Sequence, residues 1–362
     1  MRRLLLVLLL LSGATAVVEG IVPCDVADLA PECYVALRPG PTEDALGLIE
    51  IADEPVTDSA GQLVLTTVLV QSDLDLGDIW ELRNDPTSRR VDRSLYFPDD
   101  VDEDVTREQF SAQMTESTQA AAVAALRELG YELDPTGARV AGVLDDGPSA
   151  EVIEDGEVVV GLDGAEITTV DSLVEALDGL APGDTIPLEV ETLDGEVTTR
   201  EVTLASNPQD ESRPFLGLLL VTRIDVPLDI DIDAGSIGGT SAGLMFALSI
   251  VDLLTEEDLT GGRVIAGTGE IGIDGRVGPI GGIVHKIPGS ILRDDDEPAA
   301  EVFLVPRDNV EEARGAVVTQ PITLVPVDTL GDAVDALAAL RAGERPDGAF
   351  DLTPNVTAAP TG

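Results

Sequence analysis

Basic and aromatic side chains are scarce in this sequence. Its 362 residues include 21 Lys plus Arg, one His and 3% aromatics, against 69 Asp plus Glu, for a formal net charge of −48. Such a charge repels nucleic-acid phosphates, so the composition excludes a nucleic-acid-binding protein. A surface this acidic fits a solvent of high salt, where repulsion is screened, and codon bias is the alternative explanation.

Lysine is the scarcest charged residue. The only lysine, Lys286, follows the only histidine, His285, in the string "GPIGGIVHK". Arginine keeps its proton near neutral pH, whereas a buried lysine can release it. Lys286 is therefore a candidate general base, with a leftover surface lysine as the alternative.

Cysteine is nearly absent as well. Cys24 and Cys33, with one distant histidine, are too few to supply four zinc ligands, so no metal site is predicted. A P-loop is missing too, because it requires Gly-Lys-Ser/Thr and the sole lysine is followed by Ile287. The sequence thus predicts no nucleotide binding and no cofactor.

The N-terminus combines two arginines, an apolar run from Leu4 to Val18 and the string Ala-Thr-Ala. Residues 1–20 are predicted to be a signal peptide or an N-terminal membrane anchor. Fifteen helical residues span about 22 Å, less than the roughly 30 Å hydrocarbon core, which favours cleavage. Either alternative places the remainder outside the cytoplasm, secreted or attached to a membrane through the N-terminus. In an oxidising compartment Cys24 and Cys33 can form a disulfide.

Hydrophobic content of 44% supports real cores. In the N-terminal part, 21–130, the pattern predicts a strand over 61–71 and a helix over 109–129, separated by a polar surface excursion over 84–107. From 207 to 342, strands alternate with helices and predict mixed α/β layers, so the expected fold class is α+β. Residues 343–362 are rich in Pro and Gly and are predicted to be a disordered tail.

Residues 131–206 have a rhythm of their own, with "DGEVVVGLDGAEI", a helix over 170–180, the turn "PGD" and two further strands. This order resembles a PDZ domain, with another small β-rich insert as the alternative. The resemblance implies that an extended peptide binds beside the helix, at Leu173 and Leu177. It also implies a carboxylate-binding loop near Gly137 to Val140, although the family's usual glycine-rich loop is missing there.

Ser241 lies in "GGTSAG", at the start of an apolar run from Ala242 to Leu254 that is predicted to be a buried helix. Gly239 permits a tight turn before it. Unpaired N–H groups around Ser241 and Ala242 can stabilise an oxyanion. Ser241 is therefore a candidate nucleophile, with an ordinary N-cap serine as the alternative.

The strings "GGTSAG", "GTGEI" and "PIGGIVHK" together resemble the active-site segments of Lon-type serine proteases. The resemblance implies that Ser241 is the nucleophile, Lys286 the base, and Thr268 a hydroxyl that orients the lysine amine. Two departures are visible: Thr240 stands where proline is usual and is expected to cap the helix, and Pro288 is expected to break the helix that carries Lys286.

"GQLVLTT" and "MTESTQAAAVAAL" resemble the opening strand and first helix of the same protease domain, so the PDZ-like unit is expected to be inserted within it. The expected protein is an exported, ATP-independent PDZ-containing Lon-type serine endopeptidase that acts on proteins or peptides. The family often forms rings, which implies a homo-oligomer. One alternative is a Ser-His-Asp triad with His285, and another is a non-catalytic envelope scaffold that binds protein tails.

Overall fold

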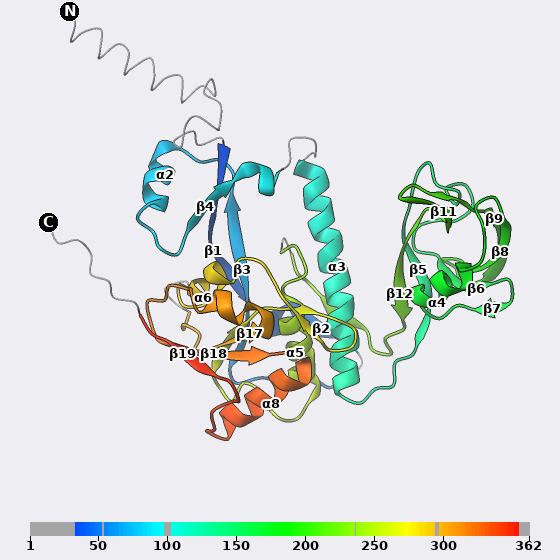
Figure 1. The fold of residues 1–362 in the computed structure, drawn as a ribbon. Helices are drawn as coiled ribbons and strands as arrows, with labels where there is room; N and C mark the ends of the chain where they lie inside the picture. Colours follow the sequence, from blue (N-terminus) through cyan, green and yellow to red (C-terminus); the bar gives the residue numbers. More distant parts are fainter. Residues whose placement is uncertain (1–32, 53, 98–102, 236, 294–296, 355–362) are drawn as a thin grey trace, which may run out of the picture. The chain divides into compact units, whose positions relative to one another are not determined.

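A computed structural model describes residues 33–52, 54–97, 103–235, 237–293 and 297–354. The chain divides into two compact units (Figure 1). The split unit combines Met1–Tyr131 with Leu228–Gly362, and the inserted unit is Glu132–Pro227. The predicted leader, 1–20, lies outside the described residues.

The split unit is built on a seven-stranded mixed sheet. Strands β3, β14, β17 and β18 are parallel to one another, while β19, β1 and β4 pair antiparallel to their neighbours. In spatial order the strands are β19 (Phe350–Leu352), β18 (Ile322–Val327), β17 (Val302–Pro306), β14 (Val264–Gly267), β3 (Gln62–Gln71), β1 (Tyr34–Asp44) and β4 (Arg89–Asp92).

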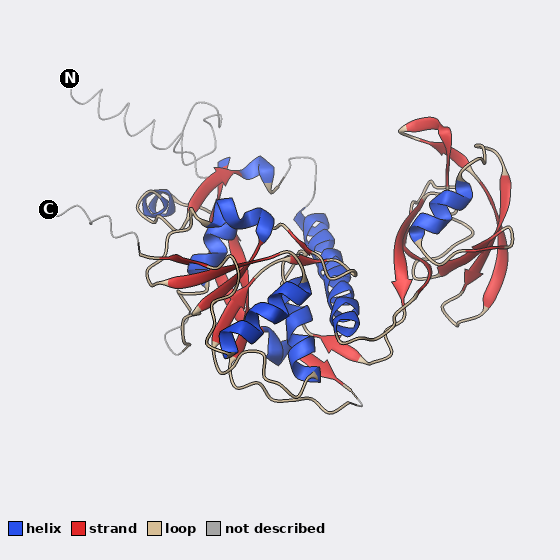
Figure 2. Cartoon of the chain, turned by 60° about the horizontal axis from the view of Figure 1, so that its bottom comes forward, coloured by secondary structure: helices blue, strands red, loops and turns tan. Residues whose placement is uncertain are grey.

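Helices cover both faces of this sheet, as the alternation of side chains along its strands requires (Figure 2). On β3, Leu63 and Leu65 belong to one apolar cluster, and Val64 between them belongs to the other. The first cluster includes residues of α3, α5 and α8, and the second includes residues of α6 and α7. Their bounds are α3 (Glu103–Glu128), α5 (Gly243–Leu254), α8 (Leu330–Arg341), α6 (Ile283–Gly289) and α7 (Val310–Ala313).

Helix α5 is apolar on every side and lies in the interior. Its residues from Gly243 to Asp252 are all buried, as a helix without a polar face requires. The predicted helix over 242–254 is confirmed to within one residue. Because α5 is fixed along its length, the residues that precede it are held at a defined point of the core.

Short elements complete the split unit, in chain order η2 (Ala45–Leu48), β2 (Ile49–Ile51), α2 (Leu76–Leu82), η3 (Arg93–Leu95), β13 (Ile230–Ile232), β15 (Glu270–Ile271), β16 (Val277–Gly278) and η4 (Arg307–Asn309). Strand β13 pairs with β2, and β15 with β16. The predicted disordered tail is wrong at Phe350–Leu352, which pairs with β18 as β19. Pairing with β18 gives the backbone groups of this short segment partners that its sequence does not reveal, and Phe350 and Leu352 pack against an apolar cluster.

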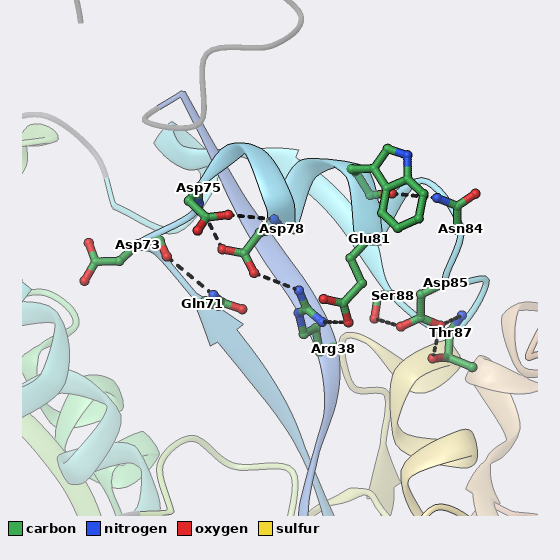
Figure 3. A network of polar contacts seen from close by, with 11 residues as sticks. Arg38, Gln71, Asp73, Asp75, Asp78, Glu81, Asn84, Asp85, Thr87 and Ser88 are labelled. Carbon is green, nitrogen blue, oxygen red and sulfur yellow. Dashed lines mark hydrogen bonds and ion pairs between the residues drawn. The ribbon is translucent and has the colours of Figure 1, made fainter. Parts of the chain in front are cut away.

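The predicted surface excursion over 84–107 is also wrong in part. Arg89–Asp92 forms β4 at the edge of the main sheet, and α3 begins at Glu103. Just before this segment, α2 is held to the sheet by Arg38 of β1, which pairs with Asp78 at 3.4 Å and with Glu81 at 3.0 Å (Figure 3). These ion pairs join residues 40 and 43 positions apart, which a local sequence pattern does not reveal.

The inserted unit contains a sheet of the order β12-β5-β6-β8-β9, with β7 paired to β6, a separate hairpin of β10 and β11, and helix α4. Its elements are β5 (Pro135–Val143), β6 (Val158–Leu162), β7 (Ala165–Glu166), α4 (Val170–Leu177), β8 (Thr185–Glu191), β9 (Val197–Thr203), β10 (Ala205–Asn207), β11 (Asp210–Phe215) and β12 (Leu218–Ile224).

The predicted end of this unit, at residue 206, is too early. Strand β12 pairs antiparallel along β5, so residues 207–227 belong to the inserted unit and not to the catalytic part. Local pattern identifies "LLLVT" as a strand but cannot identify its partner about 80 residues upstream.

We expect a fragment of residues 132–227 to unfold cooperatively in urea and a fragment of residues 132–206 to lack a cooperative transition. The longer fragment keeps β12 and the buried Leu216, whereas the shorter one exposes the edge of β5 and part of the apolar core. Far-UV circular dichroism during urea titration measures this difference. Equal transition midpoints for the two fragments would contradict the importance of β12.

Candidate active site and peptide groove

The site is located where β14 ends. The last residue of β14 to pair with β3 is Gly267, opposite Leu65. Beyond this point β3 continues to Gln71, so the carbonyl of Thr66 loses a neighbour on β14 and is open to another donor. Carboxyl ends of parallel strands are a common place for sites in α/β sheets, because neighbouring segments separate there.

Lys286 of α6 extends into this opening. Its Nζ lies 2.8 Å from the Thr66 carbonyl oxygen, 3.0 Å from Thr268 Oγ1 and 2.7 Å from Ser241 Oγ. The lysine is 3% exposed and Thr268 is 1% exposed. The structure therefore brings together the three side chains that the sequence singled out, Ser241, Thr268 and Lys286.

The hydrogen-bond inventory accommodates an uncharged amine. The Thr66 carbonyl can only accept, and the Thr268 hydroxyl donates its hydrogen to the Ser241 carbonyl at 2.9 Å, so it also accepts from Nζ. These two bonds use both N–H groups of a neutral lysine. Its lone pair is then available to accept a hydrogen bond from the Ser241 hydroxyl.

Burial favours the uncharged form of this amine. Removal from water lowers the pKa of Lys286 from 10.5 to about 7, because an apolar setting disfavours the ammonium form. Between pH 7 and about 10.5 the folded state binds fewer protons than the unfolded state, so this group makes folding more favourable as the pH rises through that window. Near neutral pH a large fraction of the folded protein holds the amine in its basic form.

Two N–H groups at the start of α5, those of Ser241 and Ala242, donate no hydrogen bond within the described part of the chain. The Ser241 carbonyl accepts from Gly269 N and from Thr268 Oγ1, both at 2.9 Å. A planar trans peptide then directs the N–H of Ala242 to the opposite side. Gly239, with φ of +86°, forms the turn before Ser241 and Ala242.

Thr240 does not have the expected capping role. The N-cap of α5 is Ala242, and it makes no side-chain cap bond. The Thr240 hydroxyl instead donates to the carboxylate of Glu270. The loop residue Thr240, at the position where the resemblance led us to expect proline, is held instead by its hydrogen bond to Glu270 of β15, which sequence alone could not indicate.

Pro288 is accommodated within α6, against expectation. The helix runs from Ile283 to Gly289 and includes the proline. The turns that follow are closed by the Lys286 carbonyl, which accepts from Ser290 N at 3.1 Å, and by the Pro288 carbonyl, which accepts from Leu292 N at 2.9 Å. The helix is short enough that the proline does not displace Lys286.

The sequence drew attention to His285, as the base of an alternative triad, but not to Thr66. The buried His285 ring donates from Nδ1 to the Thr87 carbonyl at 2.7 Å, away from Ser241. Thr66 was not predicted as a site residue, because it acts through its backbone carbonyl and any residue type supplies one. The string "GQLVLTT", already singled out for its resemblance, was the one pointer to it.

The inserted unit contains a groove between α4 and the edge strand β12, enclosing about 210 Å³. Leu173 and Leu177, both predicted, line it. The remaining lining residues are Val174, Asp178, Asn207, Arg213, Pro214, Phe215, Leu216, Gly217, Leu218 and Leu220. An apolar trough beside an unpaired strand edge suits an extended peptide.

The predicted carboxylate loop near Gly137 to Val140 is wrong. Val140 is fully buried on β5, and neither residue lines the groove. The turn that lines this groove is instead Phe215 to Leu218, which leads directly into β12. There the Leu216 carbonyl accepts from Ser149 Oγ at 2.7 Å, which turns the N–H of Gly217 the opposite way. Gly217 has φ of +71°, and a Cβ would lie 2.9 Å from Gly147 Cα, so no other residue fits without a shift.

Comparison with known proteins agrees with this arrangement. Residues 222–339 match the Lon protease (S16) C-terminal proteolytic domain. The chain carries a Lon-type proteolytic domain. Ser241, Thr268 and Lys286 all lie within the matched segment of this Lon-type domain.

Among curated proteins, Lon protease 2 of Herpetosiphon aurantiacus is 27% identical over 165 residues, which is 41% of this chain. The match spans about a fifth of that relative, 19% of its length.

Solved PDZ domains are among the structural neighbours. The PDZ domain of an SdrC-like protein from Listeria innocua matches at 19% identity and a TM-score of 0.22, covering 23% of this chain and 92% of that one. The corresponding domain from Listeria monocytogenes matches at 21% identity and 0.23, covering 25% and 94%. The chain is thus a mixed α/β protein with a Lon-type proteolytic domain and PDZ-like neighbours.

Two further expectations concern residues at the N-terminus. Cys33 is buried, and Cys24 lies outside the described residues, so their pairing stays a prediction. Within the described ranges, no helix is both long and apolar enough to cross a membrane.

Because Lys286 is the only lysine, its titration can be followed without assignment. We expect the ¹³Cε signal of protein labelled with ¹³C-lysine to titrate with a midpoint near pH 7, since burial lowers its pKa to about that value. The change is measured by carbon-detected NMR between pH 5 and 11. Lys286→Arg should lack the signal, and a midpoint near 10.5 would show that the amine is not buried as described.

Proposed function

We propose that this protein is an exported, ATP-independent serine endopeptidase that uses Ser241 as nucleophile and Lys286 as general base, and that its inserted unit recruits peptide segments of the substrate. One observation carries the proposal. The amine of the only lysine lies 2.7 Å from the Ser241 hydroxyl oxygen, at the start of a buried helix.

In the proposed reaction, neutral Lys286 accepts the proton of Ser241 as Oγ attacks the scissile carbonyl carbon. The resulting ammonium then gives this proton to the departing amine, and an acyl ester remains on Ser241. Water, deprotonated by the same amine, attacks the ester and releases the acid product. Thr66 and Thr268 keep the amine oriented in both halves, because each accepts one of its N–H groups.

The oxyanion formed in each half is assigned to the N–H groups of Ser241 and Ala242. Ala242 is the N-cap of α5 and Ser241 precedes it, so both lie at the helix N-terminus, where the partial positive charge of the helix also favours an anion. Donors fixed before the reaction are effective because they need no reorganisation when charge develops. The assignment is supported by the two hydrogen bonds that fix the Ser241 carbonyl, because they also fix the direction of the Ala242 N–H.

Independence from ATP and export are two further parts of the proposal. The 362 residues contain no P-loop, because the sole lysine is followed by Ile287. The apolar run after two N-terminal arginines supports export. Hydrolysis in buffer without nucleotide tests the first part, and location of the native protein after cell fractionation tests the second.

Recruitment is assigned to the groove between α4 and β12. A peptide that adds to the free edge of β12 gains main-chain hydrogen bonds, and its side chains meet the apolar Leu173, Leu177 and Phe215. A terminal carboxylate would meet the N–H of Gly217 and the cationic Arg213 at the groove. The proposed ligand is therefore an extended segment with an apolar end.

We expect Ser241→Ala and Lys286→Arg each to reduce hydrolysis of fluorescein-labelled casein, an unfolded protein, at least about 1,000-fold. The first variant lacks the nucleophile, and the second places a permanently protonated side chain where a base is needed. Release of fluorescent peptides by the purified ectodomain measures the rate without added nucleotide. Ser212→Ala, an exposed serine of the inserted unit, is the matched control and should retain full activity.

Activity that persists in Ser241→Ala or Lys286→Arg would sink the proposed mechanism. Peptide binding by a wild-type protein that hydrolyses no unfolded substrate would favour the scaffold alternative.

We expect Val174→Lys to raise KM for casein about tenfold and leave short-peptide hydrolysis unchanged. Val174 lines the groove and is 43% exposed, so lysine replaces apolar contact area without opening the core. Steady-state kinetics on both substrates measure the difference. Leu193→Lys, 67% exposed in the same unit but absent from the groove lining, is the control; equal effects of the two variants would argue against recruitment by this groove.

A further inference from the structure

Helix α3 contributes a buried hydroxyl to the turn from Gly239 to Ala242, which carries Ser241 and is called the nucleophile turn below. Ser117 is 4% exposed, and its Oγ donates to the Thr240 carbonyl at 3.0 Å. The two residues are 123 positions apart, and Ser117 lies outside the segment that matches the Lon proteolytic domain. The Ser117 hydroxyl therefore bonds the loop that carries Ser241 and not a carbonyl of its own helix.

The direction of this bond fixes the peptide plane before the nucleophile. In a trans peptide, the Thr240 carbonyl and the Ser241 N–H point in opposite directions. With the carbonyl held toward α3 by Ser117 Oγ and by Gly243 N at 3.3 Å, the Ser241 N–H points away from α3. No acceptor for this N–H is found within the described part of the chain.

The next peptide plane is held independently. The Ser241 carbonyl is bonded by Gly269 N and Thr268 Oγ1. Two consecutive carbonyls are therefore directed into the protein, and the two N–H groups opposite them remain for an oxyanion. Ser117 is the side-chain anchor of the first plane, as Thr268 is of the second.

Packing is close at this anchor. A Cβ added at Gly243 would lie 2.9 Å from Ser117 Oγ and 2.6 Å from Ile271 Cγ2. The close approach of α5 to α3 therefore depends on glycine at the third position of "SAG". A side chain at position 243 would displace either the Ser117 hydroxyl or Ile271.

We propose that Ser117 is a positioning residue for proteolysis, which sets the orientation of the Ser241 N–H as an oxyanion donor. The inference rests on the proposed function. Loss of the Ser117 hydroxyl leaves the weaker Gly243 contact alone on the Thr240 carbonyl, and the 240–241 peptide can rotate. The loss should appear in stabilisation of the tetrahedral state and not in binding of the ground state.

The test compares Ser117→Ala with Thr118→Ala, whose hydroxyl bonds the Thr115 carbonyl within the same helix. The readouts are kcat and KM for a fluorogenic peptide derived from a mapped casein cleavage site, and the inhibition constant of a peptide boronate on that sequence. Ser117→Ala should lower kcat about 5- to 10-fold, as expected for one neutral hydrogen bond, and weaken boronate inhibition by the same factor. KM, the pH midpoint of kcat and the behaviour of Thr118→Ala should match the wild type.

Two results would overturn the inference. One is a kcat and a boronate affinity of Ser117→Ala within twofold of wild type. The other is a loss accompanied by an equal change in KM, a shifted pH midpoint or a matching loss in Thr118→Ala, which would indicate a structural role only. Ser117→Thr retains the hydroxyl and should recover part of the rate if it folds with wild-type thermal stability.

Failure of the proposed function itself has a different signature. In that case Ser241→Ala keeps its activity, and both proposals fall. If Ser241→Ala is inactive and Ser117→Ala is unaffected, only the positioning role falls.

Discussion

Burial of the Lys286 amine constrains the positions of the three elements that bond it. Lys286 Nζ lies in an almost water-free position, where an ammonium group would require charge compensation, and no carboxylate in the described part of the chain supplies it. The amine is satisfied by neutral acceptors from three separate elements, Thr66 of β3, Thr268 after β14 and Ser241 before α5. Displacement of any one of these elements would leave a buried polar atom unpaired, so the fold and the basicity of the lysine depend on the same contacts.

The sheet explains why three elements can converge there. Helices α5 and α6 belong to apolar clusters on opposite faces of the sheet, so side chains from the two layers meet only beyond a strand end. Strand β14 ends at Gly267, where an added Cβ would lie 2.6 Å from Met245 Sδ of α5. The early end of β14 opens the Thr66 carbonyl to Lys286, and close packing at Gly267 brings the start of α5 up to the same point.

Sequence predicted the chemical groups better than the surroundings that tune them. Lys286 and Ser241 were identifiable because one is unique in the chain and the other precedes an apolar helix. Thr66 escaped because its contribution is a main-chain carbonyl, and Glu270 because its partner Thr240 is 30 residues away. The predicted carboxylate-binding loop near Gly137 to Val140 was wrong for a related reason: β12 pairs along β5 and forms the edge of the sheet, so β5 lies in the interior. Local periodicity identifies strands and helices, whereas register between distant strands is decided by the whole core.

The pairing of the first and last strands of the inserted unit, β5 and β12, explains how it can be inserted into the other unit. Pro135, at the start of β5, pairs with Ile224, at the end of β12, so the chain enters and leaves the inserted unit through one antiparallel pair. The inserted unit adds about 95 residues between α3 and the turn that precedes α5, but its two ends are joined by the pairing of β5 with β12. The entropy lost when Ser117 approaches Thr240 therefore depends on the short segments that flank this unit and not on the length of the unit itself. A hydrogen bond across 123 positions is thus no harder to form than one across a tight connection. The same register lets a separate unit be inserted between α3 and the residues before α5 without disturbing the hydrogen bond between Ser117 and Thr240.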